Sequence, residues 1–254
     1  MKVRILGCGT STGVPRIGND WGSCDPTEPK NRRRRVSILV TAGDTRILVD
    51  TTPDMREQLI DAGVPDVDAV IWTHEHADHA HGIDDLRQVF HNRGSAVSGY
   101  AGERTLRSLT RRFDYVFEGK WGYPATAEPA LIPERLELGP VTIRATEQPH
   151  GGITSTGLRF EQNGKSVGYS TDFNDLTEEM ENLFQGVDVW IVDALRARPH
   201  PTHNHLERTL SYIDRLKPGR AILTHMDNSM DYRSLLRELP SHVEPGYDGM
   251  EIEL

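Results

Sequence analysis

Six consecutive residues, H-E-H-A-D-H at positions 74–79, constrain this chain more than any other part of it. They directly follow the apolar run from Ala69 to Thr73, which has the length and composition of a buried β-strand. Four of the six can bind a metal ion, a density that a solvated polar turn, the alternative, explains poorly. On an α-helix, His74 and His76 would point roughly 200° apart. The motif therefore predicts a tight loop after a strand, with histidines that converge on a metal.

A second cation is expected beside the first. Asp78 and His79 are adjacent, so their side chains diverge from the first histidine pair and suit a neighbouring ion. Four ligands cannot complete two coordination shells, so further ligands must come from distant loops that follow strands. His150, Asp172 and His225 meet that condition, and their shared position at strand ends predicts that they complete the centre.

The order of predicted elements indicates the fold class. Each half of the chain has strands first and helices afterwards, which suggests an α/β protein with an αββα sandwich: two packed mixed sheets with helices on the outer faces. No repeat or long linker interrupts the chain, so a single domain, 1–254, is expected. The predicted strands are 3–6, 36–40, 46–50, 69–73, 141–146, 157–161, 166–170, 187–192 and 220–223, and the predicted helices are 53–61 (with Thr52 as N-cap), 103–112, 175–184, 205–215 and 232–239.

Two segments carry alternatives. The run R-R-R-R at 32–35 is either a solvated strand entry or a source of contacts to an anionic substrate, because guanidinium pairs well with phosphate. Residues 113–133 are rich in Trp, Tyr and Pro and look irregular, so they form either a flap over the substrate or an ordinary packed insertion.

Composition excludes several classes of protein. No apolar stretch approaches the roughly 20 residues that a membrane helix needs, and no signal peptide is visible, so a cytoplasmic protein is expected. Two cysteines cannot form a disulfide framework. The formal net charge of −9 argues against binding to extended nucleic acid, which needs a basic footprint.

The full constellation resembles the metallo-β-lactamase fold. Its H-x-H-x-D-H motif and its later His, Asp and His match 74–79, 150, 172 and 225, and Asp50 matches an early aspartate that supports the metal loop. A finer resemblance is to the PhnP-type phosphoribosyl cyclic phosphodiesterases. It rests on four stretches: G-x-G-x-x-x-G-V-P from Gly7, N-H-L-E from Asn204, L-T-H from Leu223, and the ending G-Y-D-G-M-E-I. One departure is that only Cys24 remains of that group's structural zinc site, where Asn228 replaces a histidine.

The resemblance implies a role for each residue. His74, His76 and His150 would hold one cation, Asp78, His79 and His225 the other, and Asp172 would bridge them. Two Zn²⁺ or Mn²⁺ ions suit these ligands. Asp78 and His205 are the expected catalytic residues, with His205 as the general acid and His200 and His203 as surface residues. Asn204, Ser11, Thr224 and Asp227 are expected to support the ligands or contact phosphate.

The expected enzyme is a metal-dependent phosphodiester hydrolase. It would cleave a small cyclic or nucleotide-like phosphodiester through a hydroxide that bridges the two cations. Phosphate or a nucleoside monophosphate should bind as a product mimic, and a homodimer, common in this fold group, is compatible with the sequence. The alternatives are a hydrolase of thioesters or lactams on the same fold and a non-catalytic metal or nucleotide sensor.

Overall fold

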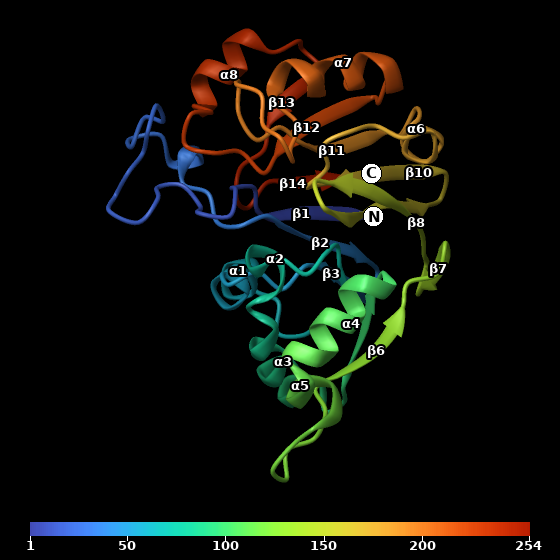
Figure 1. Ribbon diagram of the computed structural model, residues 1–254. Helices are drawn as coiled ribbons and strands as arrows, with labels where there is room; N and C mark the ends of the chain where they lie inside the picture. The colour runs from blue at the N-terminus through green and yellow to red at the C-terminus, as the bar shows by residue number, and fades with distance from the viewer.

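The computed structural model describes residues 1–254 and has two seven-stranded sheets packed face to face. Helices α7 and α8 cover the outer face of one sheet and α1 to α5 that of the other (Figure 1). The predicted αββα sandwich is confirmed. Both termini lie in the first sheet, where Lys2 pairs with Glu253 (Figure 1).

The first sheet holds the N-terminal half of the chain and the last strand. Its strands, in spatial order, are β14 (Glu251–Glu253), β1 (Lys2–Gly7), β2 (Ser37–Ala42), β3 (Thr45–Val49), β4 (Ala69–Trp72), β5 (Val97–Ala101) and β6 (Ala127–Leu131). Its helices are α1 (Met55–Ala62), α2 (Ala77–Ala80), α3 (Leu86–Arg93), α4 (Glu103–Arg112) and α5 (Asp114–Glu118), with 3₁₀ turns η1 (Pro29–Asn31) and η2 (Ile83–Asp85).

The second sheet belongs to the C-terminal half. Its strands, in spatial order, are β13 (Val243–Pro245), β12 (Arg220–Thr224), β11 (Val189–Asp193), β10 (Lys165–Ser170), β9 (Ile153–Gln162), β8 (Val141–His150) and β7 (Arg135–Leu138). Its helices are α6 (Glu178–Phe184), α7 (Leu206–Leu216) and α8 (Tyr232–Glu238). None of the helices in the structure is long and apolar enough to cross a membrane.

Strand direction explains where polar residues gather. Strands β3, β4 and β5 are parallel, as are β10, β11 and β12, so in each sheet the carboxyl ends of these strands meet at one edge. These strands are buried and apolar, with all four residues of β4 inaccessible to solvent. A core of 37 buried hydrophobic residues is drawn from both sheets and from α6, α7 and α8, and a second cluster of 18 is drawn from the first sheet and its helices. The sandwich therefore presents rigid strand ends to a shared edge.

Two local predictions were wrong. Helix α1 begins at Met55 with Asp54 as its N-cap residue, and the Thr52 hydroxyl instead accepts a hydrogen bond from the Asp54 N–H at 3.1 Å. Part of the segment 113–133 is regular, since it contains α5 and β6. Strand β6 lies at the edge of its sheet, where Pro129 is tolerated because one side of the strand needs no partner.

Candidate metal centre

Turns after the strands carry the polar residues of the site. Asp50 follows β3, Asp172 follows closely on β10, and His225 follows β12. All three have a left-handed backbone, with φ of 65°, 55° and 59°, which is costly for a residue other than glycine. Such strain persists only where the surroundings enforce it and is typical of functional sites. His150 differs from its prediction, because it is the last residue of β8 rather than part of a following loop.

Five overlapping groups of three possible ligand atoms form within this edge, and two of them match the triads that the resemblance implies. The ring nitrogens of His74, His76 and His150 all lie within 4.8 Å of one another. Asp78, His79 and His225 offer a second group within the same limit. These are the two triads that the sequence predicts, now assembled from three separate segments of the chain.

Asp172 lies between the two triads. Its Oδ1 is 3.6 Å from His150 Nε2 and 3.9 Å from His74 Nε2. Its Oδ2 is 3.2 Å from His79 Nε2 and 3.5 Å from His225 Nε2. One carboxylate thus directs a different oxygen at each triad.

Hydrogen bonds on the far side of the rings fix their orientation. His79 Nδ1 lies 2.7 Å from Asp50, and His150 Nδ1 lies 2.9 Å from the Thr202 carbonyl. Asp50 also accepts from the Thr73 N–H at 2.7 Å, so it supports the loop as the resemblance implies. With Nδ1 engaged, Nε2 of each ring points to the centre, and such supporting bonds commonly raise the basicity of metal-binding histidines.

The residues present fit a pair of divalent cations. Nε2 of His79 and of His225 are buried without any hydrogen-bond partner, which is costly unless another group binds there. Burial and the neighbouring histidines hold the pKa of His74 well below its usual value, so its ring is neutral and can bind a metal. Burial would raise the pKa of Asp78, but His79 and His225 lower it, so Asp78 is ionised.

A second carboxylate–histidine pair adjoins the centre and corrects the prediction for His203. Its ring is stacked on that of His225 at 4.8 Å between centroids, and its Nδ1 lies 3.1 Å from Asp193 and 3.7 Å from Asp172. Burial would lower the pKa of His203, but these two carboxylates raise it to about 9. His203 therefore belongs to the site and is not a surface residue.

The structure does not bring His205 to the centre. It is the N-cap residue of α7, its side chain makes no cap hydrogen bond, and it belongs to none of the metal-compatible groups. Asp193 was not among the predicted site residues. It is the last residue of the buried strand β11, and Asp50 and Asp172 likewise lie just after buried strands, so its position at a strand end could have identified it.

The expected supporting residues differ in their surroundings. Asn204 and Thr224 are fully buried, and the Asn204 amide atoms and the Thr224 hydroxyl lack partners. Asp227 accepts from the Ser229 hydroxyl at 2.6 Å, whereas Ser11 is exposed and makes no side-chain hydrogen bond.

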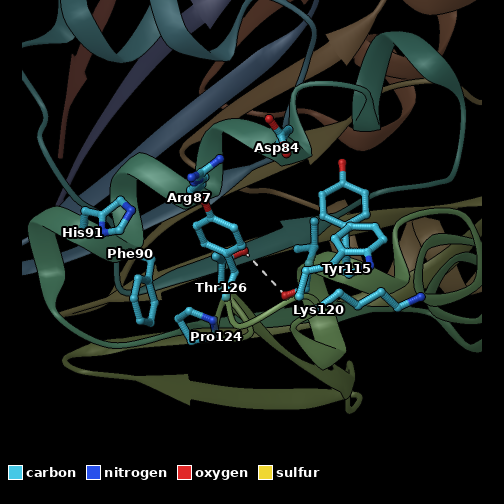
Figure 2. Close-up of a pocket in the computed structure, with 11 residues that line it drawn as sticks. Asp84, Arg87, Phe90, His91, Tyr115, Lys120, Pro124 and Thr126 are labelled. Atoms are coloured by element: carbon cyan, nitrogen blue, oxygen red, sulfur yellow. Dashed lines mark hydrogen bonds between the residues drawn. The ribbon is translucent and has the colours of Figure 1, made fainter.

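The segment 113–133 contributes to a pocket that is separate from the metal centre. Part of it lines a separate pocket of about 230 Å³ with α3, and none of the lining residues belongs to the metal centre (Figure 2). Phe90 and His91 of α3 line it together with Pro124 and Thr126 of the segment 113–133 (Figure 2). The loop between α5 and β6 extends away from α7 and α8 (Figure 1). These contacts favour a packed insertion over a flap.

Comparison with known proteins agrees with this geometry. Residues 45–226 match the model of the beta-lactamase superfamily domain, and the chain belongs to that superfamily as a hydrolase of the metallo-β-lactamase fold, a fold that implies binding of divalent metal. More specifically, it is similar to a diphosphatase from the PhnP family, with a TM-score of 0.91 and 35% identity over 100% of this chain and 96% of that one. The predicted resemblance is confirmed.

Other relatives match less completely. An octanoyltransferase of Porphyromonas gingivalis is 33% identical over 99% of this chain, which covers 51% of that protein. A ribonuclease Z of Bradyrhizobium sp. is 30% identical over 52% of this chain and 46% of that protein. The chain thus spans about half the length of these curated relatives. Zn²⁺-bound PqqB from Methylobacterium extorquens, at 19% identity and a TM-score of 0.80 over the full length of both chains, shares the fold.

Proposed function

We propose that the protein is a binuclear metal-dependent phosphodiesterase that acts on a small cyclic or nucleotide-like phosphodiester. The observation that carries the proposal is Asp172, whose two oxygens face two separate triads of ligand atoms. A carboxylate that served one cation would need only one of these contacts. His74, His76 and His150 would hold one ion, and Asp78, His79 and His225 the other.

Two divalent cations, once bound, polarise the phosphoryl oxygens and lower the pKa of water towards neutrality. The protein's own residues supply the remaining requirements. Asp50 and Thr73 hold the loop of the H-E-H-A-D-H motif. His203 is the proton donor for the departing alkoxide, because it is the one histidine that contacts the centre yet lies outside both triads. Asp193 engages its Nδ1, which leaves Nε2 free to donate.

The relatives support a phosphate-containing substrate. A diphosphatase and a ribonuclease Z are both named for the cleavage of phosphate linkages. Phosphate or a nucleoside monophosphate is then expected to bind at the centre as the product does.

A thioester hydrolase is the second candidate, and the match to an octanoyltransferase favours it specifically. Only half of that protein corresponds to this chain, so the other half is free to carry the transferase activity. The polar residues of the centre, among them the buried Asp172 and Asp193, offer little to an acyl chain and so count against the thioester.

One screen separates these candidates. Protein stripped of metal and reloaded with Zn²⁺ or Mn²⁺ is tested on a cyclic nucleotide, a dinucleotide with a diphosphate linkage, an aryl phosphodiester and octanoyl thioester. The proposal expects turnover of at least one phosphate substrate, and an Asp172→Ala control should abolish it. Turnover of the thioester alone would refute the phosphodiesterase, and no turnover of any substrate would favour the sensor.

A further inference from the structure

Arg33, one of the four arginines at 32–35, is buried. Neither interpretation of that run, a solvated strand entry or contacts to an anionic substrate, predicts this. Arg33 is 2% exposed and forms no ion pair. Its guanidinium donates to the carbonyl of Met230 at 2.6 Å and to that of Asp227 at 3.2 Å. It also donates to Asn31 Oδ1 at 3.3 Å and to Cys24 Sγ at 3.8 Å. The two terminal nitrogens of this buried cation thus bond only neutral acceptors, two of which belong to one turn, while its Nε has no hydrogen-bond partner.

The main chain of Arg33 is fixed elsewhere. Its N–H donates to the Val14 carbonyl at 2.8 Å, and its carbonyl accepts from the Val14 N–H at 2.9 Å. Next to it, the Gly9 N–H donates to the Arg34 carbonyl at 2.7 Å. The backbone of Arg33 is therefore paired with the Gly-rich N-terminal loop, while its side chain bonds residues more than 190 positions later. Arg33 thus connects the N-terminal loop to the segment 227–230 through hydrogen bonds, and this connection is called the cross-link below.

The turn that Arg33 holds, residues 225–230, begins with a proposed metal ligand. His225 has a φ of 59°, which costs free energy and requires support from its surroundings. Met226 provides some of that support, since its N–H donates to the Cys8 carbonyl and its carbonyl accepts from the Thr10 N–H. The Asp227 N–H donates to Leu195. The N-terminal loop adds a further contact, since the Ser23 N–H donates to the Asn228 carbonyl at 2.8 Å. Arg33 is the side chain that engages the carbonyls near both ends of the segment 227–230, those of Asp227 and Met230.

We propose that Arg33 is a positioning residue for the metal centre. It keeps the turn 225–230 in place, so that His225 Nε2 stays 3.7 Å from Asp78 and 3.5 Å from Asp172. The planar guanidinium suits this task because it reaches two carbonyls at once, whereas a lysine ammonium is a single point of charge. The inference rests on the proposed function, since it assigns a purpose to the position of His225.

The same run offers a matched control. Arg35 pairs with Asp54 at 3.3 Å, and its side chain is 28% exposed. It makes no side-chain hydrogen bond to the turn 225–230. Arg35→Ala removes a guanidinium from the same segment without touching the turn, whereas Arg33→Met removes the cross-link and keeps most of the side-chain volume.

The test compares thermal unfolding and metal titration. Wild type, Arg33→Met, Arg33→Lys and Arg35→Ala are unfolded with chelator and with Zn²⁺, and the metal-dependent rise in Tm is measured for each. Calorimetric titration gives the affinity for the first and second equivalents of Zn²⁺. Both Arg33 variants should lose about 10- to 100-fold in affinity for one of the two equivalents, the usual effect of removing a group that orients a ligand, and their rise in Tm should shrink. Arg35→Ala should match wild type. In Arg33→Ala, added methylguanidinium should restore part of the lost affinity.

A merely structural role gives a different result. It would lower Tm equally with and without Zn²⁺ and leave both affinities unchanged, and that outcome overturns the inference while the proposed function stands. If Arg33→Met does not fold, Arg33→Lys decides, because it retains the charge and the aliphatic stem. A wild-type protein that gains no stability from Zn²⁺ would refute the metal centre itself, and this inference with it.

Discussion

Replacing His203 by alanine should separate catalysis from metal binding. Its ring contacts Asp193 and Asp172 yet lies outside both triads, so both cations should stay bound. Loss of a general acid costs roughly 10²- to 10⁴-fold in rate. This corresponds to about 3 to 5 kcal/mol in activation free energy. The variant should therefore retain full metal content and lose most of its turnover of an alkyl phosphodiester.

The leaving group provides the diagnostic assay. An alkoxide needs a proton as it departs, whereas an acidic phenol leaves without one. His203→Ala should thus slow an alkyl diester strongly and an aryl diester far less, measured as kcat on both substrates. His205→Ala is the matched control, because His205 is two residues further along the chain and belongs to none of the metal-compatible groups. Equal losses on both substrates would mean that His203 binds phosphate, and a loss confined to His205→Ala would refute the assignment.

Three further outcomes follow from the same geometry. Asp172→Ala should lose both cations together, because one carboxylate faces both triads; elemental analysis that finds two tightly held ions would disprove the bridge. Phosphate and nucleoside monophosphates should inhibit hydrolysis competitively, since two cations leave the centre positively charged, and steady-state kinetics without such inhibition would argue against a phosphate substrate. Burial raises the pKa of Asp248 to about 7, so the folded protein keeps a proton that the unfolded chain loses near pH 4. The contribution of Asp248 to the free energy of unfolding should fall as pH rises from about 4 to 7 and then level off. In urea unfolding, the free energy of unfolding of Asp248→Asn should therefore depend less on pH over that range than that of wild type.

Periodicity and local composition were sufficient to predict most strands of the fold. Buried parallel strands such as β4 and β11 read as short apolar runs, and the hairpin of β2 and β3 has clear turn residues at Gly43 and Asp44. Strand β6 was missed because its sequence, A-E-P-A-L, is only partly apolar and contains Pro129. It becomes a strand because β5 offers it hydrogen-bond partners, and a local window of sequence does not contain that information.

The candidate ligands could be selected from the sequence because the motif 74–79 follows β4 and because His150, Asp172 and His225 lie at or just after the ends of other strands. Their grouping into two triads came from the family resemblance. His203 could not be selected in this way, because the direction of a side chain in the irregular segment before α7 depends on tertiary contacts. The Thr202 carbonyl faces His150 at 2.9 Å, and this contact turns the next residue inward. Arg33 was misread for the same reason, since its acceptors lie at Asp227 and Met230, far along the chain.

The number of cations that each chain binds tests the central proposal most directly. Protein stripped with chelator, reloaded with Zn²⁺ or Mn²⁺ and freed of excess metal is analysed for its metal content per chain. Two triads that share Asp172 predict two equivalents. One equivalent or fewer, in protein that remains folded, would contradict the binuclear centre.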